Sequence, residues 1–148
     1  MCKKILFVCT GNTCRSAMAA AIFNDIAIKE KLDVLIESAG LAAVDGEKAS
    51  ENALKAMAEV GIDLSYHRSK RLTPELIDIA DIILTMTASH KKYLLPYADG
   101  KVFTLKEYVG EEGDVTDPYG GDIGVYRATA SELNKLLTKL AEDLHDNT

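Results

Sequence analysis

Short apolar runs alternate with helical patterns along the chain. The runs that start near Ile5, Val34, Asp81 and Lys101 are typical of buried parallel strands. The last helical pattern carries one apolar stripe, formed by Tyr126, Leu133, Leu136, Leu137, Leu140 and Leu144. This alternation predicts an α/β fold with a four-stranded, doubly wound parallel sheet and helices on both faces. Because 148 residues suffice for one real core, we expect a single domain over residues 1–148.

Capping residues give the expected helix boundaries. The first helix is expected from Arg15 to Lys29. The others are expected from Ser50 to Val60 before Gly61, from Thr73-Pro74 to Ile79, from Thr87 to Leu95 before Pro96, and from Asp122 onward. Ligands of open α/β sheets bind beyond the carboxyl ends of the strands. We therefore expect Cys9, Ser38 and the segment after Thr104 to meet at one functional edge.

The segment CTGNTCRS, from Cys9 to Ser16, joins the first strand to the first helix and is called the Cys9 loop below. Free backbone N–H groups and the helix dipole converge in such a turn and make an anion site, and Gly11 lets the loop bend inward. These dipoles and Arg15 favour a nucleophilic thiolate on Cys9. The planar guanidinium of Arg15 also fits two phosphoryl oxygens. A structural cysteine followed by a capping arginine is the plainer interpretation, which the strand–loop–helix context disfavours.

The Cys9 loop resembles that of the low-molecular-weight protein tyrosine phosphatases, as does Asp117-Pro118-Tyr119-Gly120. The resemblance covers nearly the whole chain and includes Ser38-Ala39-Gly40 and His67. Thr13 stands where tyrosine-specific members usually carry a larger aliphatic residue. The segment VFTLKEYV at 102–109, followed by GDV at 113–115, is similar to the bacterial protein-arginine phosphatases. The resemblance implies a phosphocysteine on Cys9 and a phosphate cradle formed by Thr10, Gly11, Asn12, Thr13, Cys14 and Arg15.

The resemblance also implies roles outside the cradle. Asp117 is the expected acid, which protonates the leaving atom and then activates water, although Asp-Pro is also a common turn pair. Thr13 and Tyr119 are expected to set substrate selectivity. The small polar side chain of Thr13 leaves room for a planar guanidinium. For Tyr119 the plainer interpretation is an aromatic side chain packed in a turn. The expected braces of the loop are Asn12, Ser16, Ser38 and His67, although a surface histidine is the plainer interpretation of His67, which follows Tyr66 in a polar stretch.

The three cysteines, Cys2, Cys9 and Cys14, all lie within the first 14 residues, which does not resemble a disulfide scaffold. A reduced Cys9 favours a cytoplasmic setting. Cys14 is either a small core residue or a redox partner that captures oxidised Cys9 in a reversible disulfide, and we favour the redox role.

The composition limits the classes of binding partner that we expect. The net charge of −6 argues against nucleic acid, so the positive potential that phosphate needs must be local. No apolar run approaches ~20 residues, which argues against a membrane span, and the short run after Lys3-Lys4 is a strand rather than a signal peptide. His90 and His145 lack partners at ligand spacing, so we expect no metal and no other cofactor. The expected partners are phosphorylated proteins, with inorganic phosphate as product and inhibitor.

Phosphoarginine in proteins is the expected substrate, and phosphotyrosine is the alternative. The segment Leu41-Ala42-Ala43 lacks the large aromatics with which many tyrosine phosphatases of this family hold a phenyl ring. A related arsenate reductase needs two further cysteines, and none follows Cys14. A phosphocarrier, or a non-catalytic anion-binding module, has no need of Arg15 and Asp117.

Overall fold

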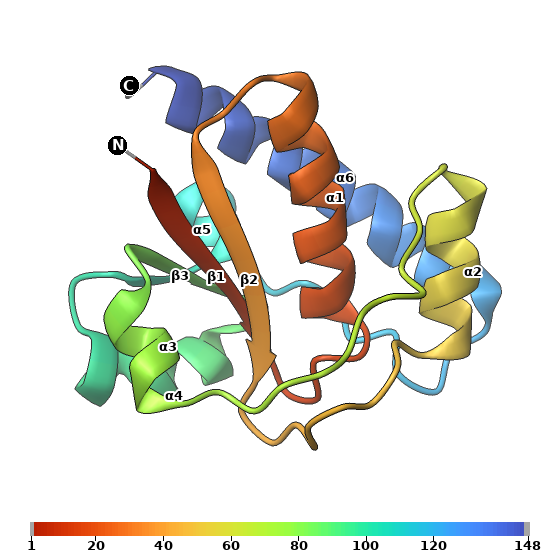
Figure 1. Ribbon diagram of the computed structural model, residues 1–148, viewed down its shortest axis with the longest axis horizontal. Helices are drawn as coiled ribbons and strands as arrows, with labels where there is room; N and C mark the ends of the chain where they lie inside the picture. The colour runs from red at the N-terminus through yellow and green to blue at the C-terminus, as the bar shows by residue number, and fades with distance from the viewer. Residues whose placement is uncertain (1, 147–148) are drawn as a thin grey trace.

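The computed structural model describes residues 2–146, whose centre is a parallel sheet in the order β2-β1-β3-β4 (Figure 1). The strands are β1 (Lys3–Cys9), β2 (Val34–Gly40), β3 (Ile82–Thr85) and β4 (Val102–Thr104). Each neighbouring pair runs parallel. The last five residues of β1 are all buried, because both faces of a central parallel strand are covered. The four-stranded α/β architecture predicted from the sequence is confirmed.

Helices cover both faces of this sheet (Figure 1). They are α1 (Arg15–Lys29), α2 (Glu51–Glu59), α3 (Pro74–Ile79), α4 (Ala88–Ala98), α5 (Leu105–Tyr108) and α6 (Ile123–Asp146). On one face α1, α2 and α6 pack together, and Phe7 of β1 meets Phe23 of α1 edge to face with ring centroids 6.0 Å apart. On the other face α3 and α4 cover Leu6 and Ile83. Within residues 2–146, no helix is long and apolar enough to cross a membrane.

Two helices differ from the sequence prediction. The expected end of α4 at Leu95 is wrong, because the helix continues through Pro96 to Ala98. Leu94 and Ala98 are both buried against the sheet and hold this last turn, while Pro96 is exposed, so water can satisfy the carbonyl that the proline leaves unpaired. The short helix α5 was not expected, and a capping box between Thr104 and Glu107 forms it.

The register brings the carboxyl ends of the strands to one edge. Cys9 pairs with Gly40, and Thr85 pairs with both Val8 and Thr104. The loops that follow the four strands therefore begin side by side. The backbone of Gly40 lies so close to the Cys9 loop that a Cβ there would stand 2.5 Å from the carbonyl oxygen of Thr10. Only glycine allows this approach, so β2 supports the loop directly through its backbone.

Candidate active site

The Cys9 loop folds around the sulfur of Cys9. Cys9 is buried at the end of β1, and its Sγ accepts the backbone N–H of Asn12 at 3.3 Å. The hydroxyl of Ser16 lies 2.8 Å from the same sulfur. Because α1 begins at Arg15, the positive end of the helix dipole also points at this spot. These dipoles converge on the position of the sulfur, which is the arrangement of an anion-binding turn.

Asn12 is the centre of the loop's internal hydrogen bonding. It is fully buried, and its φ of 57° lies in the left-handed region. Its side-chain amide donates to the hydroxyls of Ser16 at 2.8 Å and Ser38 at 2.9 Å, and accepts from the backbone N–H of Lys70 at 3.0 Å. The ring of His67 donates through Nε2 to the Asn12 carbonyl at 2.7 Å. The structure therefore brings the four expected bracing residues together.

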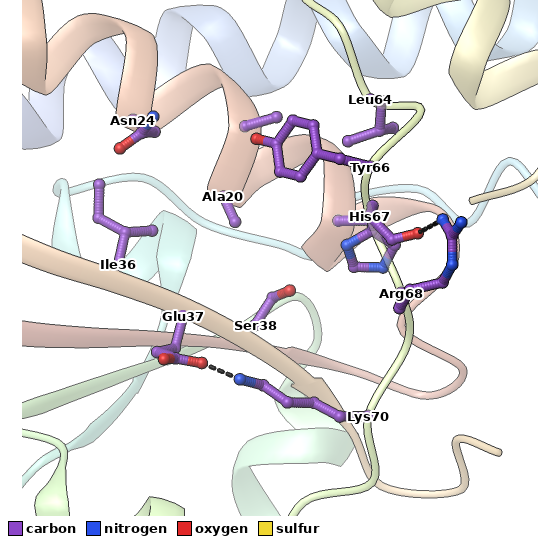
Figure 2. A pocket seen from close by; sticks show the side chains of 12 residues that line it. Ala20, Asn24, Ile36, Glu37, Ser38, Leu64, Tyr66, His67, Arg68 and Lys70 are labelled. Carbon is purple, nitrogen blue, oxygen red and sulfur yellow. Dashed lines mark hydrogen bonds and ion pairs between the residues drawn. The ribbon is translucent and has the colours of Figure 1, made fainter. Parts of the chain in front are cut away.

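A hollow of about 320 Å³ lies beside this network, between α1, β2 and segment 64–70. Figure 2 shows Ser38 and His67 among its lining side chains, with Lys70 paired to Glu37. Burial lowers the pKa of His67, against the raising effect of its bond to Asn12. The ring is therefore neutral near pH 7 and carries its proton on the nitrogen that faces Asn12.

A second hollow, of about 360 Å³, lies above the sulfur of Cys9. It shares no lining residue with the first. Its lining residues are Cys9, Thr10, Gly11, Asn12, Thr13, Cys14, Arg15, Ala42, Ala43, Val44, Glu47, Asp117 and Tyr119. Thr13 is half-buried there, whereas Tyr119 is 82% exposed. The pocket therefore contains every residue expected in the cradle, together with the expected acid and both expected selectivity residues.

Arg15 connects the Cys9 loop to the segment around Asp117. Arg15 is 5% exposed, and its Nη1 donates to the carbonyl of Val115 at 3.1 Å. Its Nη2 lies 3.6 Å from Oδ2 of Asp117. The other carboxylate oxygen of Asp117 accepts the N–H of Tyr119 at 3.0 Å, so Asp117 also forms the Asx-turn that its sequence suggests. The turn fixes one oxygen and leaves the other facing the guanidinium.

Cys14 has its contacts in the core. Its thiol donates to the hydroxyl of Ser50 at 3.5 Å and lies 3.3 Å from the hydroxyl of Tyr126. Cys9 and Cys14 are both free thiols in this structure. Burial and the neighbouring Cys14 raise the pKa of Tyr126. The redox role of Cys14 stays a prediction.

His90 contacts the Cys9 loop, a position that the sequence did not assign to it. His90 is buried, and its Nε2 lies 2.9 Å from the hydroxyl of Thr10. The available signal was the cap at Thr87, which places His90 in the first turn of a helix that follows β3. What the sequence did not show is that this turn lies beside the loop that follows β1.

The sequence profile described as low molecular weight phosphotyrosine protein phosphatase matches residues 4–148. The chain belongs to this family. The strand–loop–helix arrangement around Cys9 is thus part of a phosphatase fold, as the resemblance implied.

Three relatives of this phosphatase illustrate its position in the family. The protein-arginine-phosphatase of Bacillus subtilis (strain 168) is 50% identical over 145 residues, which cover 95% of both chains. A protein-tyrosine-phosphatase, PtpB of Staphylococcus haemolyticus (strain JCSC1435), is 42% identical over 139 residues, which cover 93% of this chain and 96% of the relative. A solved variant of the YwlE arginine phosphatase with a phosphorylated active-site serine is 49% identical, with a TM-score of 0.92 over 96% of this chain and 95% of that one.

Proposed function

We propose that this phosphatase hydrolyses phosphoarginine in proteins, with Cys9 as the nucleophile that takes up the phosphoryl group. The observation that carries the proposal is the buried sulfur of Cys9, which faces the Asn12 N–H in a pocket that Asp117 also lines. The protein-arginine-phosphatases at 50% and 48% identity support the substrate class. The phosphorylated active-site serine of the related YwlE variant supports a covalent intermediate.

In the first step the Cys9 thiolate attacks phosphorus. The S–P bond forms as the P–N bond to the substrate guanidino group breaks. Backbone N–H groups of residues 10–15 and the guanidinium of Arg15 hold the phosphoryl oxygens and the charge that develops on them. Asp117 gives its proton to the leaving nitrogen, and arginine departs as a guanidinium.

In the second step water attacks the phosphocysteine. The Asp117 carboxylate accepts a proton from the water, and the S–P electron pair returns to sulfur. The Ser16 hydroxyl, 2.8 Å from the Cys9 sulfur, stabilises the departing thiolate. Inorganic phosphate is released from the same cradle and is expected to inhibit competitively. A cytoplasmic setting, which keeps Cys9 reduced, fits this cycle.

Phosphotyrosine is the second candidate substrate. PtpB of Staphylococcus haemolyticus is named a protein-tyrosine-phosphatase, and Tyr119 at this pocket could stack on a phenyl ring. Two observations favour phosphoarginine. The wall at Ala42 and Ala43 carries no aromatic side chain, and the half-buried Thr13 offers a hydroxyl to a guanidinium.

The test compares kcat/KM on proteins that carry phosphoarginine, phosphotyrosine or phosphoserine. We expect the highest value on phosphoarginine and no turnover by the Cys9→Ser control. Thr13→Ile should shift the preference toward phosphotyrosine, because it replaces a hydroxyl by a larger apolar surface. Faster native turnover on phosphotyrosine would reject the phosphoarginine proposal. Unchanged selectivity of Thr13→Ile would reject the role of Thr13 alone.

A further inference from the structure

The side chain of His90 stands on a rigid turn next to the Cys9 loop. His90 lies in the first turn of α4, and its backbone N–H donates to the Thr87 hydroxyl at 3.1 Å. The Thr87 carbonyl in turn accepts the hydroxyl of Thr85, the last residue of β3, at 2.9 Å. The backbone that carries the imidazole is therefore fixed both by the sheet and by the helix cap.

Packing alone does not account for a histidine at this position. The side chain is 7% exposed, and its Nδ1 has no hydrogen-bond partner among residues 2–146. Burial and the charge of Arg15 lower the pKa of His90, against the raising effect of Asp114 and Asp117, so the ring is neutral near pH 7. A buried ring nitrogen without a partner destabilises the fold. Within the described residues 2–146, the ring makes one polar contact, to the Thr10 hydroxyl at 2.9 Å.

Thr10 is held from two sides. Its carbonyl accepts the N–H of Ala42 at 2.9 Å, next to the close approach of the Gly40 backbone. Its hydroxyl faces His90 on the opposite side of β1, because β1 lies between β2 and β3. The Thr10 carbonyl belongs to the peptide that carries the N–H of Gly11, within the Cys9 loop. The two contacts together fix the orientation of that peptide.

We propose that His90 is a positioning residue of the phosphate-binding loop and acts through the Thr10 hydroxyl. The inference rests on the proposed function in that it takes the Cys9 loop as the site of the phosphoryl group. Thr10 is solvent-exposed, so its hydroxyl can turn to water when His90 is removed. The fold then loses little, whereas the loop loses part of the pre-organisation on which anion binding and transition-state stabilisation depend.

The experiment measures binding of inorganic phosphate, kcat/KM and thermal stability for a set of variants. For His90→Leu we expect phosphate to bind about fivefold more weakly, the effect of one hydrogen bond, and kcat/KM to fall at least as far. The melting temperature should stay the same or rise, because an unpaired nitrogen leaves the core. Thr10→Val should weaken phosphate binding to the same extent, and the double variant should be no weaker than either single one.

Two amide variants separate positioning from bulk. His90→Gln can place its terminal nitrogen where Nε2 stands and should restore phosphate binding. His90→Asn reaches only as far as Nδ1 and should behave like His90→Leu. The inference is overturned if His90→Leu binds phosphate as tightly as the native protein, if its activity falls only in proportion to a lost folded fraction, or if the two amides behave alike. A native protein that binds no phosphate would overturn the proposed function and this inference with it.

Discussion

Replacement of Asn12 tests how much of the fold depends on the active-site loop. The Asn12 amide makes three hydrogen bonds, two to the hydroxyls of Ser16 and Ser38 and one from the Lys70 backbone. At about 1 kcal/mol net for each, their loss in Asn12→Ala lowers the free energy of unfolding by about 3 kcal/mol. The φ of 57° adds about 1 kcal/mol, because alanine tolerates the left-handed region less well than asparagine. The total of about 4 kcal/mol is a large part of the 5–15 kcal/mol typical of a domain.

Denaturant unfolding of Asn12→Ala, Asn12→Gly and the native protein measures these terms separately. Glycine loses the same hydrogen bonds without the left-handed strain, so Asn12→Gly should be the more stable of the two by about 1 kcal/mol. Asn24→Ala is the matched control: Asn24 lies exposed on α1, where alanine is the better helix former. The reasoning fails if Asn12→Ala unfolds within about 1 kcal/mol of the native protein. It also fails if Asn12→Gly is the less stable variant.

Three further predictions concern acid–base and redox chemistry. Asp117→Asn should lower kcat by about 100-fold or more with little change in KM, because it removes the proton donor but not the cradle. Steady-state kinetics measure both quantities, and a kcat equal to that of the native protein would exclude Asp117 as the acid. Peroxide inactivation should be reversed by dithiothreitol in the native protein but not in Cys14→Ser, and irreversible loss in both would refute a protective disulfide. The pKa values of His67 and His90 lie below the ordinary 6.5 in the folded state. As the pH falls, these histidines therefore take up protons in the unfolded chain before they do in the folded protein, which favours unfolding. As the pH falls below about 6.5, the melting temperature should therefore decrease, and it should decrease less steeply in His90→Leu than in the native protein. Equal pH dependence of the melting temperature in the two proteins would contradict a neutral buried His90.

Much of this structure could be predicted because the rules that form it are local. The capping hydroxyls of Ser50, Thr73 and Thr87 each accept an N–H from the first turn of the helix that they were expected to open. Asp122 likewise accepts the N–H of Val125 at the start of α6. The alternation of apolar runs gave the strands, since buried parallel strands are apolar on both faces. The short helix α5 was missed because four residues are too few for a periodic pattern, and only the Thr104 capping box marks it.

Contacts between distant segments could not be predicted in the same way. His90 and Thr10 are 80 residues apart, and neither neighbourhood carries a pattern that refers to the other. Their contact depends on the strand order, which places β3 and the start of α4 beside β1. The same holds for Arg15 and Val115, which join the Cys9 loop to the Asp117 segment. A single sequence gives the elements of this site but not the order in which the sheet arranges them.

The strand order also explains why the Cys9 loop is already shaped to bind an anion. β1 is a central strand, so loops from both neighbouring strands can contact the segment that follows it. On the β2 side the backbone of Leu41 and Ala42 donates to the carbonyls of Cys9 and Thr10. On the β3 side His90 meets the Thr10 hydroxyl. The free energy that orients the loop dipoles thus comes from folding, and a phosphoryl group that binds there need not supply it. An edge strand could offer support from one side only, so the central position of β1 is what makes this pre-organisation possible.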